Sequence, residues 1–414
     1  MDLIALLVFV ATIAAAFIFK VNSGIISIAV CLVVGRIAGV SDSQMISWFS
    51  SSLFIMLLGV MYLFCIAQEN KTLELLAKKI LSLCHGKVKL FPLILFLIAA
   101  VFSAIGPGLI SVTALISAIT VALAKACRIS PIKLLPFGTL GSFAGGLSPI
   151  TPSGIVAIGV SSSNGIEGVA FPLFWKMALT NVLYAAILYF FVFRWHRFRV
   201  EGLETEGEEK TERFNSKQLL TLLGIAVVAA LSTFFKVNVG LAAFAVATVL
   251  TVLGCADEGS ALKKVPWNTL VMITGVGILI SLVTELGGID LLSKTLSSFI
   301  GAKTAEPIIT FLAGVMSWFS SASGVVMPTL IPTVPALVAS MEGLHSVGLV
   351  VGICIGAHLA ALSPLSSCGA LMLSAYSTSG DVSAKERNRM FGQLFAMSAC
   401  GVGFGAILAA FGLY

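Results

Sequence analysis

Apolar residues occur along this chain in runs that are long enough to cross a lipid bilayer. A helix that crosses a hydrocarbon core of about 30 Å needs about 20 apolar residues. Ten such runs are separated by short polar segments, and they cover 2–19, 23–40, 51–68, 131–158, 169–193, 218–235, 239–255, 267–285, 347–374 and 391–413. The pattern therefore predicts ten membrane-spanning segments.

Two further apolar stretches, 90–124 and 307–341, are too long for one span. Each is interrupted near its middle by small or helix-breaking residues, at 103–108 and 320–324. Each arm then has about 15 residues, enough to enter the bilayer and return but short for a full crossing. We predict two re-entrant hairpins that begin and end on the same side.

The chain contains an internal repeat. FKVNSG, which begins at Phe19, recurs as FKVNVG at Phe235, and LSPITPSG at Leu147 recurs at nearly the same spacing as LSPLSSCG at Leu362. Each half holds five spans and one hairpin. Because five is odd, the second copy lies upside down relative to the first, which is the plan of inverted-repeat secondary transporters.

The predicted fold class is thus an all-α polytopic membrane protein of two inverted repeats, each with five transmembrane helices and one re-entrant hairpin, with broken helices at the midplane. Repeat 1 covers 1–193, with scaffold helices at 1–85 and the hairpin and broken helix at 90–166. A solvated cytoplasmic linker, 194–217, leads to repeat 2 at 218–414, with scaffold helices at 218–300 and the hairpin and broken helix at 307–374.

Composition agrees with this class: 58% of the residues are hydrophobic, 11% are charged, and the mean hydropathy is +1.06. These values exclude soluble enzymes, nucleic-acid binders and disordered scaffolds. The eight cysteines lie in or beside apolar runs without metal-ligand spacing, so we interpret them as packing residues.

Positive charge predicts the orientation. With the hairpin at 90–124 entering from the cytoplasm, most of the 25 lysines and arginines fall on the cytoplasmic side, as the positive-inside rule requires. The first apolar run has no basic n-region and no small-residue cleavage site, so we expect it to remain as a membrane span rather than to be cleaved as a signal peptide. Both termini are predicted to be extracytoplasmic, and the protein is placed in the plasma (inner) membrane.

Asp, Glu, Lys and Arg are absent from both hairpin stretches and, apart from Lys133 near the start of 131–158, from both interrupted spans; the second interrupted span contains one histidine, His358. Three interpretations of His358 remain open: a neutral histidine hydrogen-bonded between helices, a contact near the substrate, and a proton carrier. Glu69 and Glu285 lie at the ends of apolar runs, at matching positions in the two halves. Two interpretations are open for each: a role at a helix terminus or the membrane interface, and coordination of an ion. No HExxH, paired aspartate or serine with a histidine base is present, so the chain is predicted to transport rather than catalyse.

Proline and glycine predict a break in two spans. Pro149 and Pro152 follow Gly145-Gly146, and Pro364 lies at the corresponding place in the second half; an ordinary kink is the alternative at each. A helix broken inside the bilayer exposes N–H and C=O groups that must line a cavity. Four helix N-termini, each carrying about +0.5 charge, would total roughly +2 and suit a small dianion, with carbonyls and hydroxyls left for Na⁺.

These features resemble the ion transporter superfamily, in particular the divalent anion sodium symporters and, more closely, the malonate carrier family. AGGLSPITPSG, residues 144–154, resembles the family's Gly-Gly stretch with a Thr-Pro turn. The family's hairpin tips carry Ser-Asn-Thr; here Gly106-Pro107-Gly108 and Ser321-Ala322-Ser323 stand there, so contacts made through asparagine do not carry over. The resemblance implies a homodimer in which a transport part moves as an elevator against a scaffold.

The leading hypothesis is secondary active, Na⁺-coupled uptake of a small dicarboxylate such as malonate or succinate. The alternatives are proton coupling, a passive anion channel, and the membrane subunit of a binding-protein-dependent carrier. The expected partners are a small organic dianion, the lipid bilayer and a second copy of the chain, not nucleic acid. The candidate substrate-binding residues are Gly106, Pro107, Gly108, Thr151, Pro152, Ser321, Ser323, Ser366 and Ser367. The candidate ligands of the coupling Na⁺ are Ser103, Gly146, Ser148, Ser320, Ala361 and Ser363.

Overall fold

The computed structural model describes residues 1–19, 21–75, 79, 88–126, 129–195, 213–235, 237–377 and 382–414. All regular elements among these residues are helical, which confirms the predicted all-α class. Most of the predicted linker 194–217 lies outside the described residues, as do several residues used for the orientation, Lys20 and Arg128 among them.

The first half contains nine α-helices that the structure describes. They are α1 (Asp2–Phe19), α2 (Ser23–Ile37), α3 (Asp42–Ser47), α4 (Ser51–Glu69), α6 (Phe91–Ile105), α7 (Gly108–Ala126), α8 (Leu135–Gly145), α9 (Pro152–Ser163) and α10 (Ala170–Ile187). Helix α10 continues as a π-helical turn over Leu188–Val192.

The second half repeats this order. Its helices in the described ranges are α11 (Ser216–Phe234), α12 (Val239–Val252), α13 (Glu258–Lys264), α14 (Trp267–Glu285), α15 (Gly288–Phe299), α16 (Ala305–Phe319), α17 (Met327–Leu330), α18 (Val334–Ser340), α19 (Ser346–Leu359), α20 (Ser367–Ser377) and α21 (Ala384–Ala410). A π-helical turn, Ala322–Val326, precedes α17.

The largest difference from the predicted ends is the start of α21, at Ala384 rather than 391. Ser383 and Glu386 form a capping box: the Glu386 N–H donates to the Ser383 hydroxyl, and the Ser383 N–H donates to the Glu386 carboxylate at 3.0 Å. This cap fixes the first turn of the helix in a polar segment that precedes the apolar run. The apolar run alone therefore places the start of the helix too late.

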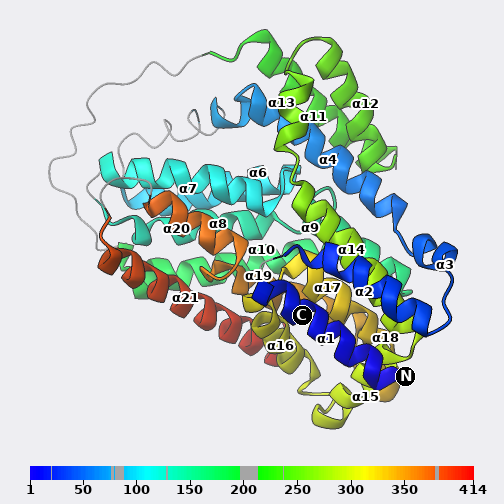
Figure 1. The fold of residues 1–414 in the computed structure, drawn as a ribbon. Coiled ribbons are helices and arrows are strands. Elements are labelled where there is room, and N and C mark those ends of the chain that lie inside the picture. Colours follow the sequence, from blue (N-terminus) through cyan, green and yellow to red (C-terminus); the bar gives the residue numbers. More distant parts are fainter. Residues whose placement is uncertain are drawn as a thin grey trace.

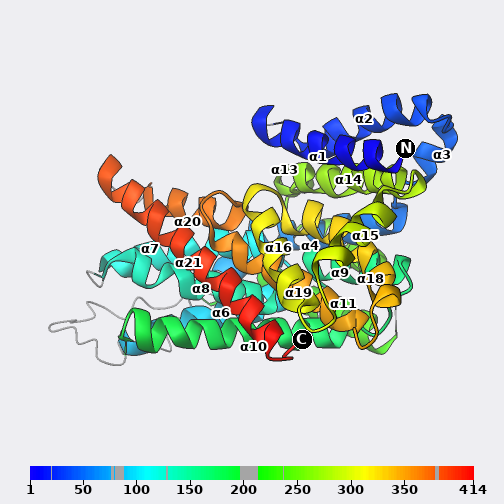
Figure 2. The same ribbon diagram turned by 90° about the horizontal axis from the view of Figure 1, so that it is seen from below.

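The helices form two groups. We call α1–α4 with α11–α15 the first bundle, and α6–α10 with α16–α21 the second bundle. Figure 1 shows α11, α12 and α13 around α4, and α1 and α2 beside α14. In Figure 2, α1, α2 and α14 lie on the side of the molecule opposite to α10.

Within the first bundle, helices of one half pack against helices of the other through glycines. On α14, a Cβ added at Gly275 would lie 2.4 Å from the Gly24 carbonyl oxygen of α2. On α4, a Cβ added at Gly59 would lie 2.3 Å from the Gly240 carbonyl oxygen of α12. Gly24 corresponds to Gly240 in the sequence repeat, and Gly59 corresponds to Gly275, so the repeat in sequence is also a repeat in packing.

The second bundle is interlocked in the same way. Helix α20 of the second half packs against α7 of the first, and α9 of the first packs against α17 of the second. Phe143 and His358 occupy equivalent positions in the two copies, and they contact each other edge to face with ring centroids 6.4 Å apart. Two positions related by the repeat therefore meet at the centre of this bundle.

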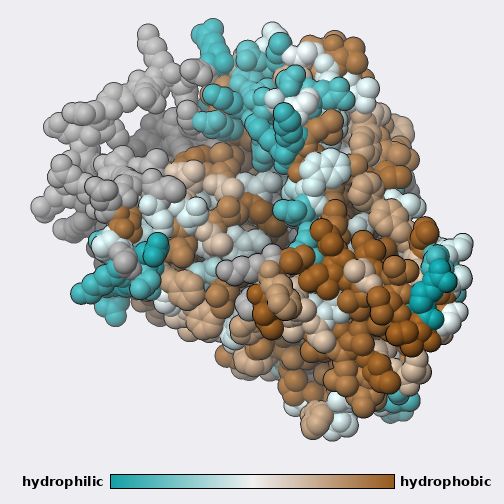
Figure 3. Space-filling view, in the orientation of Figure 1, coloured by the Kyte–Doolittle hydropathy of each residue, from teal (hydrophilic) through white to brown (hydrophobic). Residues whose placement is uncertain are grey.

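The outer surface is suited to lipid. Figure 3 shows hydrophobic residues over α1 and α2, with hydrophilic residues gathered over α11 and α13. Among the helices of at least 18 residues that are apolar enough to cross a bilayer are Ser51–Glu69 and Trp267–Glu285. The chain is a multi-pass membrane protein.

The glycine crossing between α2 and α14 gives a testable prediction. We expect Gly275→Ala to lower the stability of the purified protein by about 1–3 kcal/mol, because the added methyl overlaps the α2 backbone. Gly277→Ala, on the same helix, is the matched control, since no atom lies within 4 Å of its added Cβ. Thermal unfolding in detergent measures both, and equal melting temperatures would contradict the predicted close approach.

Candidate functional site

Two spans are interrupted where the sequence predicts. Helix α8 ends at Gly145 and α9 begins at Pro152, so residues 146–151 lie outside any helix. Helix α19 ends at Leu359, a short 3-10 turn follows at Ala360–Leu362, and α20 begins at Ser367. A simple proline kink at either place is excluded.

A hydroxyl group closes each break in the same way. The Thr151 hydroxyl donates to the carbonyl oxygens of Gly146 and Ser148, each at 2.7 Å. The Ser366 hydroxyl donates to the carbonyl oxygens of Ala361 and Ser363, at 2.6 and 2.8 Å. Carbonyls freed by the breaks therefore have protein partners, as burial away from water requires.

The first hairpin tip depends on glycine. Gly106 has φ +143° and Gly108 has φ +80°, in a region that side-chain-bearing residues rarely adopt. A Cβ at Gly106 would also lie 2.2 Å from the Phe64 ring. The tip can therefore lie directly against α4.

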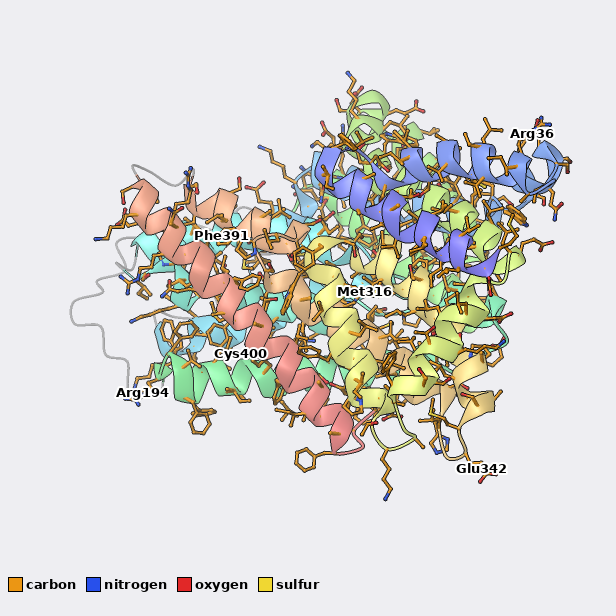
Figure 4. The ribbon with its side chains drawn as sticks, turned by 60° about the horizontal axis from the view of Figure 1, so that its bottom comes forward. Arg36, Arg194, Met316, Glu342, Phe391 and Cys400 are labelled. Atoms are coloured by element: carbon orange, nitrogen blue, oxygen red, sulfur yellow. The ribbon has the colours of Figure 1, made fainter. Side chains whose placement is uncertain are left out.

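The second tip is built on a serine cap. The Ser321 hydroxyl accepts a hydrogen bond from the Gly324 N–H at 3.1 Å, and the π-helical turn begins at the next residue. Ser320 donates its hydroxyl proton to the Met316 carbonyl oxygen at 2.7 Å, and Figure 4 shows Met316 on α16 near the centre of the molecule.

A cavity of about 350 Å³, the large cavity, lies between the two bundles at the second tip. This volume is within the range of small-molecule sites. The second bundle contributes the tip and the start of α20, and the first bundle contributes the starts of α2 and α14. The polar lining residues are Asn22, Ser23, Asn268, Thr269, Ser320, Ser321, Ser366 and Ser367.

A second cavity of about 60 Å³, the small cavity, lies at the first tip. Its lining includes Pro107, Gly108 and Pro152 from the first half, and Ser323 from the second tip. The two tips therefore lie close together, and Thr269 lines both cavities.

The predicted substrate residues are divided between these cavities. Ser321, Ser366 and Ser367 line the large cavity, whereas Pro107, Gly108, Pro152 and Ser323 line the small one. Gly106 and Thr151 are buried and line neither. The hairpin tips and breaks are thus divided between two adjacent cavities, and each tip lies with the break of its own half.

The predicted cation ligands are all near the breaks and tips, but most already have protein partners. Carbonyl oxygens of Gly146, Ser148, Ala361 and Ser363 accept the hydroxyls of Thr151 and Ser366, and Ser320 donates to Met316. Ser103 differs: its hydroxyl is fully buried and has no partner in the described structure. Each carbonyl oxygen keeps a second lone pair for a further ligand.

The centre carries no ionised side chain. None of the described residues lining the large and small cavities is Asp, Glu, Lys, Arg or His. Across the described ranges, no group of three or more His, Cys, Asp or Glu residues could hold a metal ion. Figure 4 shows the charged residues Arg36, Arg194 and Glu342 at the edges of the molecule.

His358 is fully buried on α19. Its Nδ1 lies 2.7 Å from the Cys354 carbonyl oxygen in its own helix rather than in another helix, and its Nε2 has no partner among the described atoms. Glu69 and Glu285 are the last residues of α4 and α14, and Glu69 forms an ion pair with Lys264 at 2.5 Å. Both glutamates lie at helix ends.

Sequence reasoning missed four polar residues of the large cavity: Asn22, Ser23, Asn268 and Thr269. All four lie at the start of predicted spans, away from the hairpins and breaks. The FKVNSG repeat contains Asn22 and Ser23 and was a usable signal, but nothing in the sequence placed that segment opposite the second tip.

Comparisons with known proteins agree with this architecture. The model of the citrate transporter (CitMHS) family matches residues 6–356, so the chain belongs to this family and is a transporter rather than an enzyme. The crystal structure of the YdaH transporter of Alcanivorax borkumensis is similar in fold, with a TM-score of 0.61 and 12% identity over 89% of this chain and 88% of that one. Among curated proteins, none matches this chain.

The hydroxyl closing the first break gives a second prediction. We expect Thr151→Val to remove the cap of α9, at a cost of about 1 kcal/mol, and to weaken ligand binding by loosening the turn between Gly146 and Pro152. Thr151→Ser, which keeps the hydroxyl, is the control. Ligand-dependent thermal stabilisation measures the effect; wild-type stabilisation in Thr151→Val would show that this turn does not shape the site.

Proposed function

We propose that this protein is a secondary active transporter of small organic anions with two or three carboxylates, coupled to Na⁺. Malonate and succinate suit the predicted dianion, and the family's name adds citrate as a candidate. The large cavity, neutral in its side chains and lying between two interlocked bundles, is the observation that carries the proposal.

Helix N-termini supply the attraction for anions. Four helical segments begin at the large cavity: α2, α14, the π-helical turn at Ala322 and α20. Each N-terminus carries about +0.5 charge, for a sum of roughly +2. That sum matches a dicarboxylate, and it comes partly from first-bundle helices instead of from the hairpins and breaks alone.

Unequal cavities on the two sides support alternating access. A third cavity, the apolar cavity, has only about 10 Å³ and is lined by Ile105, Ile150 and Val239 together with other aliphatic and aromatic residues. In the sequence repeat, those three are the counterparts of residues that line the large cavity, namely Ser320, Leu365 and Ser23. One side is thus open and the equivalent side is closed, as expected for one state of a carrier.

The proposed motion is a displacement of the second bundle, as the transport part, against the first bundle, as the scaffold, in the manner of an elevator. Each bundle is interlocked across the two halves, so each moves as a unit. With the predicted orientation the large cavity opens to the cytoplasm and the termini are extracytoplasmic. A homodimer formed through the first bundle would hold the scaffold still.

Na⁺ is the proposed coupling ion because the centre offers oxygen atoms and no carboxylate among its described lining residues. The unpartnered Ser103 hydroxyl and the second lone pairs of the break carbonyls are the proposed ligands. A bound cation would add positive charge beside the anion, and this explains why the two would bind together.

Uptake into proteoliposomes tests substrate and coupling. We expect Na⁺-dependent uptake of at least one labelled acid among malonate, succinate and citrate, and we expect His358→Gln to keep it, because no proton carrier is needed. Protein-free liposomes are the control. Uptake driven by a pH gradient that His358→Gln abolishes would favour proton coupling, and the absence of counterflow would favour a passive channel.

Thiol accessibility tests the alternation. In a Cys400→Ser background, we expect a cysteine at Ser23 to react quickly with an impermeant maleimide and one at Val239 to react slowly, because only Ser23 lines an open cavity. Substrate with Na⁺ should change the two rates in opposite directions. Parallel changes, or fast labelling at both positions without substrate, would contradict alternating access.

A further inference from the structure

Hydrogen-bond partners distinguish two kinds of polar residue in the large cavity. Ser320 and Ser366 donate their hydroxyl protons to backbone carbonyls. The Asn22 side chain is also used: its amide donates to the Asn268 carbonyl oxygen at 2.7 Å and its oxygen accepts the Gly24 N–H at 2.9 Å. These residues hold the cavity in shape.

The donors left for a ligand are mostly on the first bundle. Within the described part of the chain, the side chains of Ser23, Asn268, Thr269 and Ser367 have no hydrogen-bond partner. Ser367 belongs to the second bundle, and so does Ser321, whose hydroxyl accepts the Gly324 N–H and keeps its own proton to donate. We call Ser23, Asn268 and Thr269 the polar wall.

The two halves of the chain differ at the polar wall and agree around it. The counterparts of Ser23 and Thr269 are the apolar residues Val239 and Leu53. The counterpart of Asn268 is Ser52, so one of these three counterpart positions has a donor side chain. The neighbouring structural residues are the same in both halves: Asn22 and Asn238, Gly24 and Gly240, Met272 and Met56. Asn238 even makes the same cap, accepting the Gly240 N–H at 3.0 Å.

From these observations we infer that the polar wall binds a carboxylate of the transported anion in the state seen here, and that it makes the affinity of the protein unequal on the two faces of the membrane. A carboxylate only accepts hydrogen bonds, so it needs the donors that Ser23, Asn268, Thr269 and Ser367 have free. When the second bundle moves, the anion leaves the polar wall and meets a surface with two apolar residues in its place. The inference rests on the proposed function, and it adds which residues bind the carboxylate and on which face of the membrane the affinity is higher.

Exchange of counterpart residues tests the inference. Uptake of labelled malonate, succinate or citrate, whichever the wild type carries, is measured in right-side-out and inside-out membrane vesicles. We expect the double variant Ser23→Val with Thr269→Leu to raise the half-saturating concentration about tenfold on the cytoplasmic face, to which the large cavity opens in the predicted orientation. On the opposite face the half-saturating concentration should stay within about twofold of the wild-type value. The conservative variant Thr269→Ser keeps a donor, so we expect it to raise the half-saturating concentration less than Thr269→Leu does.

The reciprocal exchange, Val239→Ser with Leu53→Thr, is expected to lower the half-saturating concentration on the opposite face only. It keeps the test decisive if the first double variant folds poorly. Equal changes on both faces, or no change in either double variant, would overturn the inference while leaving the transport function in place. A wild type that carries none of the acids would instead overturn the proposed function.

Discussion

The need to satisfy every backbone hydrogen-bonding group away from water governs this structure. A continuous helix meets that need by itself, whereas a broken one exposes carbonyls and N–H groups that lipid cannot bind. Thr151 and Ser366 meet the need at the two breaks with one hydroxyl each, and both use the same pair of carbonyl positions. Because the carbonyl ends are closed from within, the irregular backbone can persist beside a cavity without a resident charged side chain.

Interlocking of the two halves is the second constraint, and it decides which helices pack into one bundle. The glycines of α2, α4, α12 and α14 let backbones from opposite halves approach closely, so neither half has a bundle of its own. Inside a bilayer the hydrophobic effect does not drive helices together, because lipid tails are as apolar as the side chains. Small residues at the crossing permit the close packing that holds the helices in contact. The packing boundary therefore runs between the bundles rather than between the repeats.

The two halves are nearly symmetric, but they diverge locally at the cavities. The large cavity and the apolar cavity share counterpart positions but differ greatly in volume, about 350 Å³ against about 10 Å³. Residues that maintain the helix crossings are the same in both halves, while the residues with free donors differ. The residues that line the cavities can therefore differ between the halves without altering the helix crossings that hold the protein together.

The all-helical class, the positions of the hairpin tips and breaks, and the doubling of the chain could all be predicted, because apolar run length, the placement of Gly and Pro, and a recurring motif are visible in the sequence itself. Helix ends such as Ala384 could not, because a capping box rather than hydrophobicity set them. The site was half predictable: Ser321, Ser366 and Ser367 were marked by the chemistry of broken helices, but Asn268 and Thr269 look like any polar residues at the start of a span. Only the tertiary structure brought α2 and α14 opposite the second tip, because that proximity arises from glycine crossings between residues of opposite halves, and no local pattern specifies which helix a glycine will meet.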